Sequence, residues 1–447
     1  MTKERMNDVN NNPVVFPCEN LTADENGHLL FGGYDTAALA ETYGTPLYLL
    51  DDARIRHNCR VYLDAFKKYY PEGSLPLYAS KANACKQIYR IMREEGMGID
   101  VVSVGEIYTA KAAGFDLSKA FFHGNNKTDA DIAYAMDCGV GCFVADNAEE
   151  ILAIEAAAKQ RDIRQKVLLR LTPGIDTHTY AAVNTGKVDS KFGNAIATGQ
   201  AEAITKLALL QPHVDLRGFH CHIGSQVFTE DVFERAAVIM IDFMADLRDT
   251  LGYTAAVLNL GGGYGVRYVD TDPYLDIAQK IHAVSDVLKA ACEARAFPVP
   301  TIHMEPGRSI VADAGLTLYT VGAVKQIPGY KNYVSVDGGM TDNPRFALYG
   351  SKYTCVAATR LTEARDFPAS LVGRCCESGD ILQEHVPFPS TIRRGDLVAV
   401  CTTGAYNYAM SSNYNRIGRP ATVLLTAEGP QVAVRRETPE DMARLDV

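Results

Sequence analysis

Residues 75–84 read Leu-Pro-Leu-Tyr-Ala-Ser-Lys-Ala-Asn-Ala, a short apolar run that opens into a lysine. The run Leu75–Tyr78 predicts a buried strand, and the apolar spacing over Cys85–Glu95 predicts a helix directly after it. Lys81 therefore stands where a buried strand ends. Desolvation or a cationic neighbour at such a position gives a neutral amine, which forms Schiff bases with carbonyls. A lysine that merely caps the strand is the alternative for this stretch alone.

Outward from this stretch, apolar strands alternate with helical patterns. The predicted strands are Leu75–Ala79, Ile99–Val102, Ala120–Phe122, Cys142–Ala145, Val167–Leu171, Leu216–His220, Val257–Leu260 and Thr301–Met304. The predicted helices between them are Ile107–Ala113, Asp129–Asp137, Ala148–Lys159, Gln200–Leu209, Asp231–Leu251 and Tyr274–Ala294. Eight such units over roughly 230 residues fit a closed (β/α)8 TIM barrel of parallel strands. An open doubly wound sheet is the alternative.

After Arg308 the pattern changes to short strands with no long helical pattern between them. These strands are Leu316–Ile327, Tyr333–Val336, Tyr353–Ala358, Ser370–Val372, Asp396–Thr402, Ala421–Leu425 and Gln431–Arg435. Near the N-terminus, strands are predicted at His28–Phe31 and Leu47–Leu50, and helices at Thr36–Tyr43 and Asp52–Lys68. We expect three parts: residues 1–50 joining a β domain, 51–310 forming the barrel, and 311–447 forming a mostly-β domain of sandwich or barrel type.

Composition limits the functional classes. A chain of 447 residues exceeds one ordinary domain, and 47% hydrophobic residues supply an ample core. The net charge of −10 comes without basic clusters, which argues against nucleic acid or an anionic membrane as partner. The polar start Met1–Asn12 does not resemble a secretory signal, and eleven scattered cysteines favour a reduced, cytoplasmic enzyme.

Polar or glycine features follow every predicted barrel strand, and barrels carry their chemistry at those carboxyl ends. In strand order the features are Lys81, Asp100 with Ser103 and Glu106, His123, Asp146, Arg170, His220 with His222, Gly261–Gly265, and Glu305–Arg308. Barrels commonly bind phosphate with the loops after strands seven and eight, and glycines let backbone N–H groups approach it closely. Here both of those loops contain glycine.

A lysine, a phosphate-binding loop and a carboxylate together suggest pyridoxal 5'-phosphate (PLP) as cofactor. Glu305 suits the acid that keeps the ring nitrogen protonated, His222 could stack on the ring, and Ser225 could donate to the phosphate. His220 and His222 could instead be structural, or belong to a metal-dependent hydrolase. Only His303 lies near the last two strands and no Asp ends strand eight, so we expect no metal.

The motifs resemble those of the fold-type III PLP-dependent decarboxylases, in order and from about residue 45 to 425. In the barrel they are Tyr78–Asn83, Asp100–Glu106, His220–Gln226, Gly261–Gly263 and Glu305–Arg308. In the second domain they are Asn343–Tyr349, Cys376–Asp380 and Gly404–Tyr406. Phe346 stands where many relatives have proline.

The resemblance implies roles for individual residues. Lys81 would bind the cofactor covalently, Glu305 would pair with its ring nitrogen, and His222 would stack on the ring. The further cofactor-binding residues are Asp100, Ser225, Gly261, Gly262, Gly263, Gly307, Arg308 and Tyr406. The substrate-binding residues are Arg308, Arg345, Tyr349, Glu377 and Tyr406, with Cys376 as the acid near the reacting carbon.

The implied activity is decarboxylation of meso-2,6-diaminopimelate at its D-centre to L-lysine and CO2, by a homodimer whose sites are shared between subunits. Guanidinium forks suit the retained carboxylate, and Glu377 could answer the distal ammonium. We prefer Cys376 to Cys375 as the acid because Glu-Ser-Gly-Asp follows it directly. The alternatives are a same-fold decarboxylase of ornithine, lysine, arginine or carboxynorspermidine, a racemase, and an inactive paralogue that binds a partner.

Overall fold

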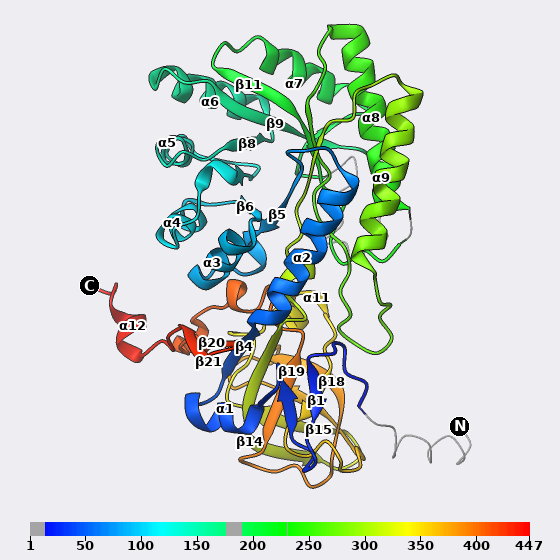
Figure 1. Ribbon diagram of the computed structural model, residues 1–447. Coiled ribbons are helices and arrows are strands. Elements are labelled where there is room, and N and C mark those ends of the chain that lie inside the picture. Colours follow the sequence, from blue (N-terminus) through cyan, green and yellow to red (C-terminus); the bar gives the residue numbers. More distant parts are fainter. Residues whose placement is uncertain (1–13, 176–189, 230) are drawn as a thin grey trace. The chain divides into compact units, whose positions relative to one another are not determined.

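The computed structural model describes residues 14–175, 190–229 and 231–447 (Figure 1). These residues form two compact units. The barrel unit comprises His57–Gly265 and Leu275–Ser309. The β unit comprises the described residues up to Arg56 together with Val266–Tyr274 and Ile310–Val447. The polar start Met1–Asn12 lies outside the described residues.

The barrel unit is built on a closed ring of eight parallel strands. They are β5 (Leu75–Ala79), β6 (Gly98–Val101), β7 (Ala120–Phe122), β8 (Cys142–Ala145), β9 (Gln165–Thr172), β11 (Val214–Cys221), β12 (Val257–Asn259) and β13 (Thr301–Met304). The ring closes because β13 pairs with β5, where His303 lies opposite Leu75. The short β10 (Asn194–Ala195) adds to the edge of β9. The predicted barrel is confirmed, and closure excludes the open sheet.

Helices cover the outside of this ring in Figure 1. They are α2 (Asp52–Tyr69), α3 (Lys86–Glu95), α4 (Val104–Ala112), α5 (Asp129–Asp137), α6 (Ala148–Gln160), α7 (Gln200–Leu209), α8 (Val232–Leu251) and α9 (Ile277–Ala294). Local sequence sets several ends: Thr128 and Asp131 form a reciprocal capping box at α5, and Gly96 ends α3 in the left-handed conformation. None of the helices in the described part of the chain combines the length and apolar character that a membrane crossing requires.

The barrel strands are largely apolar and buried, because both of their faces are covered, although β9 and β11 carry polar residues near their starts. Leu77, Ile99 and Leu258 are fully buried, as are the large rings of Phe143 and Phe219. Each such side chain contributes about 1.5–3 kcal/mol on burial. Continuous burial explains why these strands lack the alternation of polar and apolar residues seen in half-exposed sheets.

The β unit contains the strands that follow the barrel and some that precede it. They are β1 (Leu21–Ala23), β2 (Leu29–Phe31), β3 (Tyr34–Asp35), β4 (Leu47–Asp51), β14 (Gly315–Ile327), β15 (Lys331–Val336), β16 (Cys355–Ala357), β17 (Phe367–Val372), β18 (Ile381–Phe388), β19 (Leu397–Cys401), β20 (Ala421–Thr426) and β21 (Gly429–Val434). The short helices α1 (Thr36–Tyr43), α11 (Arg345–Tyr349) and α12 (Pro439–Ala443) accompany them, and α10 (Arg308–Val311) begins in the barrel unit and ends in the β unit. The main sheet runs β18-β17-β15-β14-β4-β20-β21, while β19 pairs with both β14 and β16.

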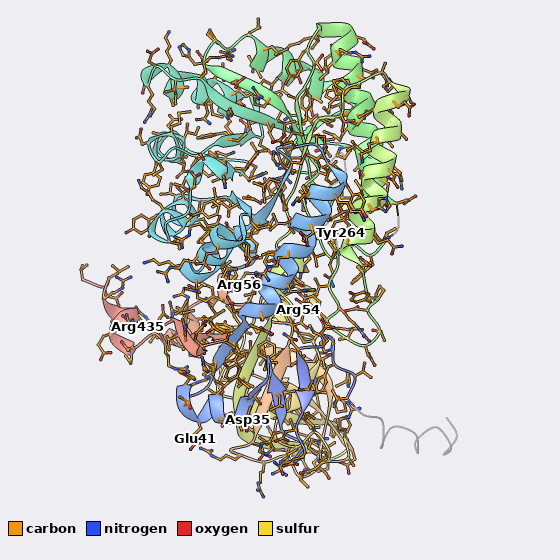
Figure 2. The ribbon with its side chains drawn as sticks, viewed as in Figure 1. Asp35, Glu41, Arg54, Arg56, Tyr264 and Arg435 are labelled. Atoms are coloured by element: carbon orange, nitrogen blue, oxygen red, sulfur yellow. The ribbon has the colours of Figure 1, made fainter. Side chains whose placement is uncertain are left out.

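The strand β4 occupies the centre of this sheet although it precedes the barrel in the chain. It pairs antiparallel with β14 and parallel with β20. Before β4 in the chain, Asp35 at the end of β3 caps α1 by accepting a hydrogen bond from the Ala37 amide (2.8 Å). Arg54, labelled with Asp35 in Figure 2, pairs with Asp313 (2.7 Å) and Glu19 (2.6 Å). Hydrogen bonds and ion pairs thus anchor the N-terminal part of the chain in the β unit.

Strand β18 was not predicted from the sequence. Its polar residues Gln383, Glu384 and His385 interrupt the apolar run, and Pro387 argues against a strand. The structure accommodates them because His385 adopts a positive φ of 55° and the pairing with β17 shifts register. Pairing therefore overrides a weak local pattern here.

Candidate active site

Lys81 lies where β5 gives way to a single 3-10 turn, Ser80–Ala82. Its two neighbours Ser80 and Ala82 are buried, whereas the lysine itself is exposed at the carboxyl end of the strand. The turn is held by the Tyr78 hydroxyl, which donates to the Asn83 carbonyl (2.9 Å). The sequence thus forces a lysine amine out of a buried strand into the barrel mouth.

Glu305 lies just beyond the end of β13 and is surrounded by hydrogen-bond donors. The His123 Nε2 lies 2.7 Å from its Oε1, and the His220 Nε2 lies 3.1 Å from its Oε2. The Asn259 side chain donates to Oε1 at 2.7 Å. All four residues are buried, and we call this group the Glu305 cage.

The cage controls the charge of Glu305. Burial alone would raise the pKa of its carboxyl group, but the adjoining imidazoles of His123 and His220 outweigh burial and hold that pKa well below its usual value. Burial lowers the pKa of His220 to about 4, so its imidazole is neutral near pH 7. Glu305 is therefore an anion that accepts hydrogen bonds from neighbouring donors.

Asp100 lies near the end of β6, and the pKa of its carboxyl group moves in the opposite direction to that of Glu305. Its carboxyl group is buried, and its Oδ1 lies 3.9 Å from the His123 Nε2. Burial raises its pKa, although the nearby His123 and Lys81 partly oppose the shift. The structure thus places the predicted residues Asp100 and Glu305 near the same nitrogen of His123, its Nε2.

The glycine loop after β12 forms hydrogen bonds with both His222 and Glu305. Gly261 has a φ of 68°, and its carbonyl accepts from the Glu305 amide (2.8 Å). The Gly262 amide donates to the Nδ1 of His222 (3.3 Å). A Cβ at Gly262 would lie only 2.0 Å from the Glu305 carbonyl oxygen. Side chains are therefore excluded where the loops after β11, β12 and β13 meet.

Ser225, Gly307 and Arg308 complete the barrel side of the site. The Arg308 Nη2 donates to the Ser225 Oγ at 3.0 Å. A Cβ at Gly307 would lie 2.9 Å from that of Ala79, which keeps this loop close to the end of β5. A guanidinium, a hydroxyl and glycine-bearing loops form a donor set that suits a phosphate.

His222 is half-buried beside this loop. Burial and the positive charges of Lys81 and Arg170 hold the pKa of its imidazole well below its usual value. The ring is therefore neutral near pH 7, and its Nδ1 acts as an acceptor for Gly262. A neutral, oriented imidazole is suited to stack on a flat cofactor ring.

In the β unit the structure brings three predicted residues together. The Arg345 guanidinium lies 5.2 Å from the centre of the Tyr406 ring and 5.3 Å from that of Tyr349. Tyr406 adopts a positive φ of 65°, which is strained for a residue with a bulky side chain. Such strain is common where a side chain must be aimed at a ligand.

The two adjacent cysteines of the β unit differ in exposure. Cys375 is buried, its amide donates to Asp380 (2.7 Å), and burial raises the pKa of its thiol to about 11. Cys376 and Glu377 are exposed, and the Cys376 amide donates to the Asn415 side chain (2.7 Å). Among these neighbours, only Cys376 offers its thiol to a ligand from outside the unit.

Sequence reasoning did not assign a role to Asn259, although the structure places it in the Glu305 cage. The residue ends the strand β12 and is fully buried. A buried amide at the carboxyl end of an apolar barrel strand was the available signal. His123 and His220 were noticed at strand ends, but not as partners of Glu305.

The fold and the site define a class: (β/α)8-barrel enzymes with a lysine on the first strand, a caged acid on the last and glycine loops for an anion. The family model described as "Pyridoxal-dependent decarboxylase, pyridoxal binding domain" matches residues 53–312. The chain belongs to this family of pyridoxal-dependent decarboxylases.

Within that family, the chain resembles diaminopimelate decarboxylases over nearly its whole length. It is 44% identical over 424 residues to the enzyme of Bacillus subtilis (strain 168), covering 95% of this chain and 96% of that one. It is 40% identical to the enzyme of Mycobacterium tuberculosis (strain H37Rv), covering 97% and 98%. A crystal structure of the M. jannaschii enzyme in complex with L-lysine superposes with a TM-score of 0.88 at 31% identity, covering 97% and 99%.

Proposed function

We propose that this protein binds PLP through Lys81 and decarboxylates meso-2,6-diaminopimelate to L-lysine and CO2, the last step of bacterial lysine biosynthesis. The observation that carries the proposal is the ionised Glu305, held by donors in the same barrel mouth as an exposed lysine amine. The similarity to diaminopimelate decarboxylases over 95% of the chain supports the choice of substrate.

The residues of the barrel mouth fit the cofactor. Glu305 is an acceptor for a ring N–H, His222 is a neutral ring, and Ser225 with the glycine loop offers donors to a phosphate. When bound, PLP supplies a carbonyl for amines and a ring that accepts the electron pair left by CO2. The Asp100 carboxyl, the Arg308 backbone and the Tyr406 side chain complete the proposed cofactor contacts.

The protein's own residues perform the remaining steps. The Lys81 amine would hold the cofactor, and the Glu305 carboxylate would keep a proton at the cofactor's ring nitrogen. The bond between the D-centre carbon and its carboxylate breaks, and CO2 leaves. The thiol of Cys376 would give its proton to that carbon, and the thiolate left behind would take a proton from water, so that one proton is consumed for each CO2 released.

Charged groups of the β unit suit the rest of the substrate. Arg345 and Arg308 each offer paired N–H donors to a carboxylate. The rings of Tyr349 and Tyr406 lie beside the Arg345 guanidinium. Glu377 can bind the distal ammonium, which distinguishes diaminopimelate from shorter diamino acids. Ornithine, lysine, arginine and carboxynorspermidine are the alternative substrates. Each has a single carboxylate and therefore none that is retained.

The exposed Cys376–Glu377 pair supports a homodimer in which each subunit completes the other's site. A thiol needed at the reacting carbon has to meet a second surface, and a partner copy provides one. No disulfide joins any of the eleven cysteines, all of which lie among the described residues, and this supports the proposed reducing, cytoplasmic compartment. Neither nucleic acid nor a membrane enters the proposal.

A substrate panel tests the proposal. Purified protein should be yellow, and borohydride should attach the cofactor permanently to Lys81, identified by peptide mapping. It should release CO2 and L-lysine from meso-diaminopimelate and leave ornithine, lysine and arginine unchanged. Lys86→Ala, a change of an exposed lysine on α3, is the control for loss of labelling. Release of CO2 from ornithine or lysine alone would overturn the substrate but not the cofactor.

A further inference from the structure

The Glu305 cage contains more donors than an ordinary buried carboxylate pair. Oε1 lies 2.7 Å from the His123 Nε2 and receives the Asn259 amide at 2.7 Å, while Oε2 lies 3.1 Å from the His220 Nε2. His220 is 1% exposed and Asn259 is fully buried, so water does not satisfy these groups instead. Both carboxylate oxygens therefore have fixed protein partners.

The orientation of Asn259 is set by its second contact. Its Oδ1 accepts a hydrogen bond from the Gly261 amide (2.9 Å), so its Nδ2 must be the atom that faces Glu305. Gly261 begins the glycine loop proposed to hold the cofactor phosphate. One side chain thus joins the acid that faces the ring nitrogen to the loop that faces the phosphate.

The tautomer of His220 also follows from which of its ring nitrogens has a hydrogen-bond partner. Its Nδ1 is buried and has no hydrogen-bond partner among the residues that the structure describes. A buried N–H without an acceptor is costly, so the single proton of the neutral ring lies on Nε2 and points at Glu305. His220 is therefore a donor to the carboxylate although it carries no charge near pH 7.

The same three side chains, His123, His220 and Glu305, could in principle hold a metal ion, since their ligand atoms lie within 4.8 Å of one another. Asn259 argues against that use. Its amide N–H occupies one lone pair of the Glu305 Oε1, an atom that would have to ligate the metal. A proton on the His220 Nε2 likewise occupies the lone pair of that nitrogen. The group is arranged to donate hydrogen bonds to a carboxylate.

We infer that His123, His220 and Asn259 are positioning residues that keep Glu305 ionised and aimed at the cofactor's ring nitrogen, and that Asn259 couples Glu305 to the phosphate loop. The inference rests on the proposed function, because it requires PLP in the barrel mouth. With its other lone pairs occupied by protein donors, the carboxylate can hold a proton on the ring nitrogen but does not take that proton itself.

Nitrogen NMR of the enzyme reconstituted with ring-labelled PLP measures the first part of the inference. In the wild type the ring nitrogen should stay protonated well above neutral pH. His220→Leu should lower its apparent pKa by about 1 to 2 units, since one hydrogen bond to a charged group is lost. His220→Gln, which keeps an N–H donor, should restore most of that shift.

His303 is the matched control for these variants. It is a buried barrel histidine on β13, and its Nδ1 contacts the Leu75 carbonyl (2.9 Å) rather than the Glu305 carboxylate. His303→Gln should leave the titration of the ring nitrogen unchanged. An equal shift in His303→Gln and His220→Leu would overturn the inference, because general loosening of the barrel would then explain both.

The affinities of apoenzyme for PLP and for pyridoxal, which lacks the phosphate, measure the second part. Asn259→Leu should weaken PLP binding about tenfold more than pyridoxal binding, because the Gly261 amide loses its acceptor. His220→Leu should weaken both equally. An unchanged ratio in Asn259→Leu would overturn the coupling to the phosphate loop.

The outcomes separate the two levels of the argument. Wild-type protein that binds no PLP would overturn the proposed function, and this inference with it. Wild-type protein that binds PLP with a protonated ring, while His220→Leu and Asn259→Leu titrate like the wild type, would overturn only the role of the cage. Circular dichroism of each variant reports whether the fold is retained.

Discussion

The barrel unit and the β unit each contain a buried carboxyl group, and the pKa values of the two groups move in opposite directions. Glu305 is hydrogen-bonded by the Asn259 amide and the His220 Nε2, and the imidazoles of His123 and His220 hold its pKa well below the usual value. Burial raises the pKa of Asp342 to about 7, although the Tyr319 hydroxyl and the Gly339 amide donate to it. Burial disfavours the charge in both places, so the number and nature of the donors decide the outcome.

The two units also differ in how they present reactive side chains. In the barrel mouth His220 and Glu305 are 1% and 7% exposed, and each has a fixed partner. In the β unit Cys376 and Glu377 are exposed; the Cys376 amide donates to the Asn415 side chain, and the Glu377 carboxylate accepts from the adjacent Ser378 and Gly379. The barrel mouth therefore holds its candidate residues in fixed positions, whereas the candidate residues Cys376 and Glu377 of the β unit face outward. The proposed partner subunit would supply the surface that these two residues meet.

The largest expected effect comes from the barrel side of this comparison. Lys81→Ala removes the amine that binds the cofactor, so release of CO2 from meso-diaminopimelate should fall below detection. The visible absorption of the bound cofactor and its borohydride attachment should disappear as well. Lys86→Ala should retain all three. Full activity of Lys81→Ala would contradict the placing of the cofactor in the barrel mouth.

Next in size is the effect of the exposed thiol in the β unit. Cys376→Ala should lower kcat by about 10²- to 10⁴-fold, the range for loss of a general acid, with an unchanged Tm because the side chain is exposed. Cys375→Ala should do the reverse, with a lower Tm and nearly normal kcat, because that residue is buried. If Cys375→Ala were instead the variant that loses kcat, the assignment of the acid would have to be exchanged.

Substitution of two glycines compares a tightly packed backbone position in the barrel unit with an uncrowded one in the β unit. A Cβ at Gly262 meets the Glu305 carbonyl at 2.0 Å, so Gly262→Ala should cost about 2 to 3 kcal/mol of stability and weaken PLP binding. A Cβ at Gly379 in the β unit meets nothing closer than the Glu377 carboxylate at 3.8 Å. Gly379→Ala should therefore leave the denaturant midpoint nearly unchanged. Equal destabilisation by both would show that the barrel loops can shift.

Much of the fold could be predicted because long-range pairing reinforces a strong local pattern. Strands β5, β7, β8 and β13 and helices α5 and α7 have the predicted bounds, since each is an uninterrupted apolar or amphipathic segment. β18 could not be predicted, because its stability comes from pairing with β17 and not from its own residues. The start of α9 was placed at Tyr274, but the helix begins at Ile277 and Tyr274 is 81% exposed.

The candidate site, like the fold, contains residues that could be predicted from the sequence and residues that could not. Residues that stand at strand ends, such as Lys81 and Glu305, could be found because barrel topology fixes where those ends meet. The partners of Glu305 could not be assigned, because side-chain hydrogen bonds between strands distant in sequence leave no spacing to detect. The hydrogen-bond partners of Asn259 and the tautomer of His220 cannot be deduced without the geometry.

The smallest expected effect concerns Asp342. This carboxyl is 1% exposed, and burial raises its pKa to about 7, with Asp380 and Asp337 adding to the shift. A folded-state pKa above the unfolded value means that the stabilisation is full below about pH 4 and is lost as the pH rises through about 7. In that window the free energy of unfolding should fall by at most about 1.4 kcal/mol per pH unit from this group.

Asp342→Asn removes the titrating group, so the stability of the variant should vary less between about pH 4 and 7 than that of the wild type. Urea denaturation at several pH values measures the slope, and Glu428→Gln, a change of an exposed carboxylate in the same unit, is the control. Glu305 should behave in the opposite sense, since a lowered pKa contributes stability at neutral pH that is lost on acidification. Parallel slopes for wild type and Asp342→Asn would mean that the Tyr319 and Gly339 donors keep Asp342 ionised, as the cage does for Glu305.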